Sequence, residues 1–535
     1  MTLWQPTAAF APLRLHDLLD SPAIRADAVA IVDGTNEWTY AQLRQGVQAL
    51  ARRIVRSGAQ RGDRVALLLP KCLDECAALF AASRVDTVVV PIHPVLRPAQ
   101  VSHVLADCEA RVLVTRRSLL DGLGEPLAAL RARQDLSIIC LDDEPASPAA
   151  PGEAQPDNEA LAPSCNIGAD LAAILYTSGS TGLPKGVMLS HSNLVAGTRI
   201  VRSYLGISAA DRILSVLPFS FDYGLNQLLT VVEQGARIVL LSFQLGDQIV
   251  RQLDRHRITG LAGVPTVWAM LTRAAPSLAK TPLPDLRYIT NSGGAVPEAT
   301  VRRLRELLPA TQIFLMYGLT EAFRSTYLPP DQVDRRPTSI GKAIPECEML
   351  VITADGRLAV PGEPGTLVHR GPTVSMGYWR RPEETARVLR PHPLRPAVEG
   401  GEIVCWSGDL VTTDDEGYLY FVGRQDAMIK SAGYRISPSE VEDVLMDSGA
   451  FRQVAVIGLP DEWVGQRVIA VAVAVAEGGD ATASVDQALA LAAQRLPAHM
   501  VPARIDLVAE LPTTPNGKVD VKRLVAERTA PAVGP

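Results

Sequence analysis

The stretch YTSGSTGLPKGVMLSH, residues 176–191, gathers hydroxyl groups and glycines around a single lysine. Successive backbone N–H groups and hydroxyls of such a loop can point at one anion. Lys185 adds a positive charge, and a charge pair at about 4 Å with an effective dielectric constant near 20 contributes roughly 4 kcal/mol. A surface turn rich in serine and glycine does not usually combine TSGSTG with PKG. The pattern therefore predicts a phosphate-binding loop.

This loop differs from a Walker A motif. Counting from Gly179, that motif places Gly-Lys-Ser/Thr where this chain has PKG, so no hydroxyl follows the lysine to bind magnesium. Lysine is also rare in the chain, which has 52 basic residues of which seven are lysine. Lys185, Lys430 and Lys518 all lie in glycine-rich or polar motifs. Their positions indicate that these motifs require an ammonium group.

The elements that must position the loop follow a strand–helix rhythm. In the first 140 residues, 64–70 and 87–92 read as buried strands, with a helix over 74–85 between them and another strand over 110–115. This alternation predicts a parallel sheet covered by helices on both faces. Residues 141–169, rich in proline, alanine and acidic residues, are expected at the surface.

A second strand–helix series is expected from LAAILYT, at residue 171, to QIFLMYG, at residue 318. From about 340 to 425, short strands and frequent turns indicate a small β-rich subdomain. In the last part of the chain, the nine-residue run VIAVAVAVA is too short to cross a membrane and predicts a buried strand. The fold class is therefore α/β, with two doubly wound sheet subdomains and the β-rich one in a large N-terminal domain, residues 1–425. A small mobile α+β domain, residues 426–535, follows.

Composition limits the class of protein. The chain has 535 residues, too many for one hydrophobic core, and its net charge of −6 argues against a nucleic-acid partner. The N-terminus lacks a basic start followed by an apolar run, which argues against a signal peptide. Seven cysteines are scattered without the spacing of a zinc site, so a reducing, cytoplasmic location is expected.

Five motifs occur in order along the chain. After the phosphate loop come MYGLTE (316–321), SGDL (407–410), FVGRQDAMIKSAGYRISPSEVE (421–442) and PTTPNGKVD (512–520). Together they resemble the AMP-forming adenylating enzymes: acyl-CoA synthetases, adenylation domains of peptide synthetases and beetle luciferases. The resemblance covers nearly the whole chain. MYGLTEAFRSTYLPP and SIGKAIP further resemble the acyl-CoA ligases associated with exosortase and exopolysaccharide loci.

The resemblance implies two half-reactions. A carboxylate attacks the α-phosphate of ATP, giving acyl-AMP and pyrophosphate, and a thiol then takes the acyl group. Because the first step brings anions together, catalysis depends on positioning and charge neutralisation. The implied cofactors are ATP and Mg²⁺, and the thiol acceptor is CoA or a phosphopantetheinyl carrier protein.

The matched motifs also imply the residues that bind the nucleotide. These are Thr177, Ser178, Gly179, Ser180, Thr181, Gly182, Lys185, Gly293, Gly294, Ala295, Tyr317, Gly318, Asp409 and Arg424. The loop and Lys185 match the contacts to the departing phosphates, Tyr317 matches the aromatic residue stacked on adenine, and Asp409 and Arg424 match the ribose contacts. Thr320 matches a catalytic phosphate contact, and Glu321 matches the magnesium ligand.

The C-terminal domain is implied to carry two catalytic lysines for two steps. Lys518 matches the lysine that reaches the carboxylate and α-phosphate during adenylation. Lys430 and Gly433 match the thioester-forming state, in which Gly433 leaves room for a pantetheine arm. Asp426 matches the hinge about which this domain rotates between the steps.

The acid itself is less well defined by sequence. Residues 218–229, PFSFDYGLNQLL, resemble the lining of the acyl pocket, and Ser292 is also assigned to substrate binding. Asp222 matches the carboxylate that binds the α-amine in amino-acid-activating members, but it is equally well placed to cap the following helix. Arg324 either favours an acidic or polar acyl group or forms a structural ion pair.

These features predict a ligase for an amino acid or another small polar acid, and the alternative is a medium- or long-chain fatty acyl-CoA synthetase. Because no carrier domain follows Lys518, the expected acceptor is CoA or a separate carrier protein. A non-catalytic nucleotide-binding protein would predict loss of Glu321 or Lys518, and both are present. A luciferase-like oxidation shares the motifs but needs a special substrate.

Overall fold

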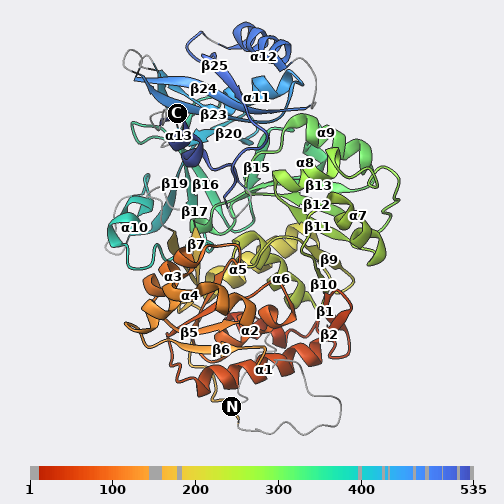
Figure 1. Cartoon of the computed structure of the whole chain (residues 1–535), viewed down its shortest axis with the longest axis vertical. Coiled ribbons are helices and arrows are strands. Elements are labelled where there is room, and N and C mark those ends of the chain that lie inside the picture. Colours follow the sequence, from red (N-terminus) through yellow and green to blue (C-terminus); the bar gives the residue numbers. More distant parts are fainter. Residues whose placement is uncertain are drawn as a thin grey trace, which may run out of the picture.

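Figure 1 shows the computed structural model, which describes residues 11–143, 160–177, 184–395, 401–424, 428–431, 434–461, 465–475, 481–496, 498–514 and 518–529. Three sheets, with helices packed against them, make up this part of the chain. The expected α/β class with a separate C-terminal unit is confirmed.

The first sheet has six strands among the described residues, and its last two strands flank the predicted phosphate loop. The strand order is β6 (Ser137–Cys140), β5 (Ala110–Thr115), β3 (Arg64–Leu68), β4 (Val88–Ile92), β7 (Leu171–Thr177) and β8 (Lys185–Ser190). In β3, Val65 and Leu67 pack into one hydrophobic cluster and Ala66 and Leu68 into another. Burial on both faces explains why this strand reads as a continuous apolar run.

The second sheet is larger and joins parallel and antiparallel parts. Its path is β16 (Glu348–Ile352), β17 (Gly365–Arg370), β19 (Ile403–Thr413), β20 (Leu419–Arg424), β15 (Ser339–Ala343), β14 (Thr326–Leu328), β13 (Gln312–Tyr317), β12 (Tyr288–Asn291), β11 (Gly260–Gly263), β9 (Arg212–Ser215), β10 (Arg237–Leu240), β1 (Val29–Asp33) and β2 (Asn36–Thr39), with β18 (Leu389–Pro391) paired to β19. The strands from β9 to β13 are parallel. Their carboxyl ends therefore meet along one edge.

Helices cover the faces of both sheets. They are α1 (Tyr40–Arg56), α2 (Leu73–Arg84), α3 (Pro98–Asp107), α4 (Arg117–Arg131), α5 (His191–Leu205), α6 (Asp222–Gln234), α7 (Gly246–Arg255), α8 (Pro265–Arg273), α9 (Glu298–Leu307) and α10 (Pro382–Val388). Short 3-10 helices span Leu15–Asp20, Thr320–Ala322 and Pro330–Gln332. Helix α5 starts at a capping box made by Ser190 and Asn193 and ends at Gly206, whose φ of 60° lies in the left-handed region.

The C-terminal unit lies at the top of Figure 1, above β15, β16, β17 and β19. It contains β21 (Ile429–Ser431), β22 (Tyr434–Ile436), β23 (Phe451–Asp461), β24 (Gly465–Ala474), β25 (Arg504–Leu507), α11 (Pro438–Asp447), α12 (Ala481–Arg495) and α13 (Val521–Thr529). The apolar run from Val468 forms buried β24, as predicted. Arg273 of α8 donates a hydrogen bond to the carbonyl of Arg452 at 2.7 Å, which links this unit to the N-terminal part.

Three strand pairings differ from the sequence-based expectation. Strand β7, expected to begin the second series, pairs in parallel with β4 in the first sheet. The β1–β2 hairpin lies within the first 140 residues, where the first sheet was expected, but it pairs with β10 in the second sheet. The β-rich residues form no separate sheet, because β15 pairs with β14 and continues the parallel sheet. Local hydrophobic patterns predict that a strand forms, but its neighbour depends on long-range packing.

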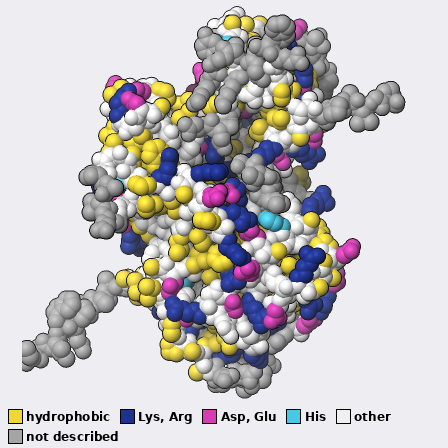
Figure 2. Space-filling model, turned by 90° about the vertical axis from the view of Figure 1, so that its left-hand side faces the viewer, with side chains coloured by type: hydrophobic (Ala, Val, Ile, Leu, Met, Phe, Trp, Pro, Cys, Tyr) yellow, Lys and Arg dark blue, Asp and Glu magenta, His cyan; other side chains and the backbone are white. Residues whose placement is uncertain are grey.

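Charged side chains of both signs share the face drawn in Figure 2, where dark blue and magenta groups are interspersed. Ion pairs such as Arg370–Glu348 and Arg395–Glu402 occur at the surface. Within the described residues, no helix combines the length and apolar character needed to cross a membrane. Residues 144–159 of the expected surface segment lie outside the described ranges.

Candidate active site

The candidate site lies where parallel strands of the second sheet end. Strands β9, β11, β12 and β13 finish at Ser215, Gly263, Asn291 and Tyr317. The segments that follow carry nine of the predicted site residues: Asp222, Ser292, Gly293, Gly294, Ala295, Gly318, Thr320, Glu321 and Arg324. In open α/β sheets, ligands bind outside the carboxyl ends of the strands. The topology therefore brings together motifs that are far apart in sequence.

Lys518 reaches this edge from the C-terminal unit. A Cβ atom placed on Gly293 would lie 3.9 Å from Cε of Lys518, 3.5 Å from the Phe221 ring and 3.4 Å from Val264. Gly293 also has a φ of +84°, which side-chain-bearing residues rarely adopt. The Lys518 side chain is exposed, and the backbone N–H of Thr514 donates to its carbonyl at 2.7 Å. The loop after β12 thus leaves space that the lysine side chain approaches.

Tyr317, Asp409 and Arg424 form a second group at this edge. The Tyr317 hydroxyl donates a short hydrogen bond to Asp409, and Arg424 Nε lies 3.6 Å from the other oxygen of that carboxylate. Asp409 and Arg424 are direct partners in the β19–β20 ladder. The Tyr317 ring stacks on buried His369, with centroids 6.0 Å apart. Burial, reinforced by the Asp409 charge, holds the pKa of Tyr317 well above its usual range.

Glu321 is held by a tyrosine from a distant segment. The Tyr378 hydroxyl donates to Oε1 of Glu321 at 2.6 Å. Nζ of Lys185, at the start of β8, lies 5.7 Å from the centre of the Tyr378 ring and forms an ion pair with Glu384 of α10. Tyr378 therefore links the predicted metal ligand to the predicted phosphate-binding lysine, a relationship that the motifs do not reveal.

Five more predicted residues, which are Ser292, Gly294, Ala295, Gly318 and Thr320, lie on the same edge. Ser292 is buried and its N–H donates to the Gly263 carbonyl at 3.4 Å, whereas Gly294 and Ala295 are exposed. Thr320 starts the short helix after β13 and is largely buried. A Cβ on Gly318 would lie 3.5 Å from Cα of Arg324, which places the glycine against the arginine's backbone.

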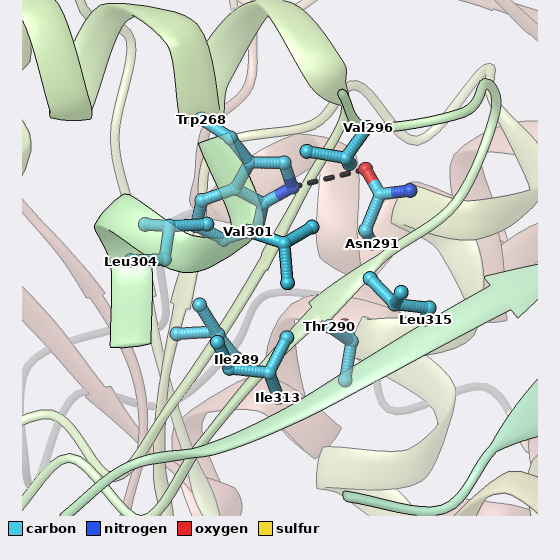
Figure 3. A pocket seen from close by; sticks show the side chains of 9 residues that line it. All are labelled: Trp268, Ile289, Thr290, Asn291, Val296, Val301, Leu304, Ile313 and Leu315. Atoms are coloured by element: carbon cyan, nitrogen blue, oxygen red, sulfur yellow. Dashed lines mark hydrogen bonds between the residues drawn. The ribbon is translucent and has the colours of Figure 1, made fainter. Parts of the chain in front are cut away.

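Trp268 and Asn291 support the glycine segment and were missed in the sequence. Trp268 Nε1 donates to the Asn291 side-chain oxygen at 3.0 Å, and Asn291 Nδ2 donates to the Gly294 carbonyl at 2.9 Å. Figure 3 shows the two side chains meeting above a small pocket lined by aliphatic residues between α8, α9 and the sheet. Asn291 directly precedes SGG and could have been noticed, but Trp268 gives no local signal.

Asp222 and Arg324 bind each other. Arg324 Nη1 donates to the Asp222 carboxylate at 3.2 Å and Nη2 donates to the Asp222 carbonyl at 3.2 Å. The N-cap residue of α6 is Phe221, so Asp222 is the first helical residue and does not cap the helix. Burial raises the pKa of Asp222, and the charge of Arg324 acts in the opposite direction. The structural ion pair considered from sequence for Arg324 is the arrangement found.

A strained turn delivers Arg324 to the interior. Phe323 has a φ of 51° although it is not glycine, which costs on the order of 1–3 kcal/mol. Its buried ring packs against Gly197, where a Cβ would come within 2.4 Å of the ring. The close contact with α5 fixes the turn, and Arg324 follows directly.

Several predicted residues lie outside the described ranges. They are Ser178, Gly179, Ser180, Thr181, Gly182, Asp426 and Gly433. Thr177 and Lys185, which flank the phosphate loop, face each other in the β7–β8 ladder. Lys430 lies in β21 opposite Arg435, and only its backbone is described.

Comparison with known proteins identifies the class to which this fold and site belong. The family model for AMP-binding enzymes matches residues 20–379. The family model for the AMP-binding enzyme C-terminal domain matches residues 440–518. The chain therefore belongs to the AMP-binding enzyme family, as expected from its motifs.

Similar proteins include acid–thiol ligases of the same length. The chain is 32% identical to indoleacetate–CoA ligase of Aromatoleum aromaticum, covering 97% of this chain and 99% of that protein. It is 32% identical to L-proline–[L-prolyl-carrier protein] ligase of Streptomyces coelicolor, covering 94% of each. These full-length matches confirm the expected family of AMP-forming acid–thiol ligases.

Two further matches define the extent of the likeness. A linear gramicidin synthase of Brevibacillus parabrevis is 31% identical over 97% of this chain, but the chain spans only 10% of that protein. Among solved structures, ATP-bound MatB from Rhodopseudomonas palustris superposes with a TM-score of 0.85 at 28% identity, covering 97% of this chain and 99% of MatB.

Proposed function

We propose that this protein joins a small polar carboxylic acid to ATP, releases pyrophosphate, and transfers the acyl group to the thiol of CoA or of a separate carrier protein. The observation that carries the proposal is the position of Lys518 beside Gly293, at the edge where Tyr317, Asp409 and Glu321 also lie. Lys518 would bring a positive charge to the place where a carboxylate and a phosphate must approach each other.

The first step makes a mixed anhydride. An oxygen of the acid attacks the α-phosphorus of ATP, and the bond from that phosphorus to the bridging oxygen breaks, so pyrophosphate leaves with the bonding electrons. Lys518 would neutralise the two approaching anions, and Lys185 with its loop would bind the departing phosphates. Tyr317 would stack on adenine, and Asp409 with Arg424 would bind the ribose hydroxyls.

Glu321 fits a magnesium site completed by the nucleotide. Mg²⁺ is usually bound by one or two carboxylates together with phosphate oxygens and water. Within the described residues, no group of three or more His, Cys, Asp and Glu side chains is arranged to hold a metal, so Glu321 would supply the protein's share. The ion, when bound, would neutralise phosphate charge, while Tyr378 keeps the Glu321 carboxylate in place.

The second step would use another orientation of the C-terminal unit. The sulfur of the thiol attacks the acyl carbonyl carbon, AMP leaves with the electrons of the broken C–O bond, and the thiol proton is lost to solvent. We assign Lys430 and Gly433 to this state, with Asp426 as the hinge between residues 1–425 and 426–535. The motif order and the separate sheet of the C-terminal unit support this assignment.

The ion pair between Asp222 and Arg324 favours a small polar acid over an amino acid. An α-ammonium group would have to compete with a guanidinium that already binds the Asp222 carboxylate.

The CoA and carrier-protein ligases among the relatives support either thiol acceptor. A fatty acid is the second candidate. Seven free cysteines support a cytoplasmic setting.

Carboxylate-dependent ATP–pyrophosphate exchange tests the proposal. Amino, hydroxy, aryl and fatty acids are offered to the purified protein, and the nucleotide product is identified by chromatography. We expect exchange and AMP with small polar acids. Release of ADP and orthophosphate with every acid would overturn the proposal.

A further inference from the structure

The ion pair between Lys185 and Glu384 involves the same ammonium group that the proposed function assigns to the phosphates of ATP. Nζ of Lys185 contacts Oε2 of Glu384, and the two side chains are only 16% and 25% exposed. This carboxylate oxygen is shielded from water and accepts no hydrogen bond from any other group in the described part of the chain. A negative charge that belongs to the protein therefore lies directly beside the proposed phosphate-binding lysine.

Main-chain hydrogen bonds place the two residues next to each other. The N–H of Trp379 donates at 2.8 Å to the carbonyl of Gly186, the residue after the lysine. The N–H of Tyr378 donates at 2.9 Å to the hydroxyl of Thr385, the residue after the glutamate. The segment before α10 is thus bound both to β8 and to the helix itself. The ion pair therefore joins two fixed elements and differs from a chance meeting of two long surface side chains.

A carboxylate at this position opposes the binding of phosphate groups to Lys185. Pyrophosphate and the β- and γ-phosphates of ATP are multiply charged anions, and like charges repel strongly where water is largely excluded. To reach the ammonium group, a phosphate either displaces Glu384 or shares the lysine with it. Both arrangements reduce the net attraction. AMP has neither of these phosphates, so Glu384 should not affect its binding.

We propose that Glu384 is a positioning residue that competes with the departing phosphates for Lys185 and thereby promotes the release of pyrophosphate. This inference rests on the proposed function and adds a means of product release to the same site. A lysine without this competitor would bind a multiply charged anion more tightly, and product release limits the turnover of many enzymes. Glu384 acts through Lys185 and needs no contact with the reacting atoms.

Direct binding measurements with Glu384→Gln test the proposal, because this variant removes the charge and keeps the shape of the side chain. Calorimetric titrations use three probes at a fixed Mg²⁺ concentration and without any acid. The probes are inorganic pyrophosphate, AMP, and an ATP analogue with a methylene group between the α- and β-phosphorus atoms. We expect the Kd for pyrophosphate and for the analogue to fall by about 5-fold or more, and the Kd for AMP to stay unchanged. An unchanged or higher Kd for pyrophosphate overturns the inference.

The neighbouring glutamate provides a matched control. Glu383 lies in the same turn of α10 but is exposed, so Glu383→Gln should leave all three Kd values unchanged. An equal gain in Glu383→Gln would assign the effect to the general charge of the helix and would overturn the inference. The gain in Glu384→Gln should also shrink as the salt concentration rises, because ions screen the repulsion. A partly unfolded variant cannot imitate a gain of affinity.

A double-variant cycle shows whether Glu384 acts through the lysine. Lys185→Gln should weaken the binding of pyrophosphate, and adding Glu384→Gln to it should restore clearly less affinity than Glu384→Gln adds to the wild type. The same gain in both backgrounds would mean that Glu384 acts independently of Lys185, which overturns the positioning role.

The outcomes separate this inference from the proposed function. If Lys185→Gln leaves pyrophosphate binding unchanged, the phosphate-binding role proposed for Lys185 fails, and the role of Glu384 fails with it. If Lys185→Gln weakens binding but Glu384→Gln does not strengthen it, the proposed function stands and only the role of Glu384 is removed.

Discussion

Asp222 and Arg324, which are 102 residues apart in the sequence, form an ion pair in which each side chain is only 4% exposed. One residue starts helix α6 and the other follows the short helix after β13, so the pair ties the predicted acyl-pocket segment to the segment that carries Thr320 and Glu321. A pair of this kind contributes less to stability than its charges suggest, because both groups lose water. Its consequence is to remove a free charge from the site.

We expect Arg324→Met and Asp222→Asn each to lower the free energy of unfolding by about 3–5 kcal/mol, because either change leaves one buried partner unpaired. The double variant Asp222→Asn with Arg324→Met should lose clearly less than the sum of the single changes. Urea denaturation of the four proteins measures the coupling. Strictly additive losses would show that the two charges do not interact.

Lys518→Ala should abolish ATP–pyrophosphate exchange, with a loss of at least about 100-fold, while still transferring the acyl group from supplied acyl-AMP. Lys430→Ala should show the reverse pattern, since we assign it to thioester formation. Lys522→Ala is the matched control, because that lysine follows Lys518 by four residues and belongs to α13. If both variants fail in the same half-reaction, the assignment of two lysines to two orientations is wrong.

Tyr378→Phe should raise the KM for magnesium-bound ATP by about 10-fold or more. The variant removes the hydrogen bond to the Glu321 carboxylate, and bonds to charged groups contribute about 1.5–3 kcal/mol. Titration with magnesium-bound ATP in the exchange assay measures this KM. Tyr420→Phe removes a comparable hydrogen bond, to Asp414 instead of Glu321, and should leave this KM unchanged. Equal KM values for magnesium-bound ATP in the two variants would contradict the positioning role of Tyr378.

His369 should make the protein less stable in mild acid. Burial lowers the pKa of His369 to about 3, so below pH 6.5 the unfolded chain binds a proton that the folded chain excludes. Stability is therefore lost as the pH falls from about 6.5 towards the folded value. Between pH 7 and pH 5.5 this one group contributes a loss of about 1.3 kcal/mol.

His369→Phe keeps a ring against Tyr317 and removes the titrating group, so its stability should fall by about 1.3 kcal/mol less than the wild type over that range. Guanidinium denaturation at the two pH values measures the difference. The comparison is between two proteins, so other titrating groups cancel. The same pH dependence in both proteins would exclude His369 as the source.

The sequence by itself predicted most of the local structure and the family. Apolar runs predicted β3, β4 and β24 because a strand buried on both faces needs continuous apolar residues. Motif spacing led to the family and to four predicted site residues, Tyr317, Glu321, Asp409 and Lys518. Each of these residues lies within a short motif, and the motifs occur in the expected order along the chain.

Only the tertiary structure decided which distant groups meet. It placed β7 in the first sheet, paired Asp222 with Arg324 and set Tyr378 on Glu321. Local periodicity carries no information on such contacts, because a helix or strand pattern is repeated within a few residues while its partner lies far away along the chain. The pairing of the charges of Asp222 and Arg324 therefore followed from packing, and the motifs alone did not determine it.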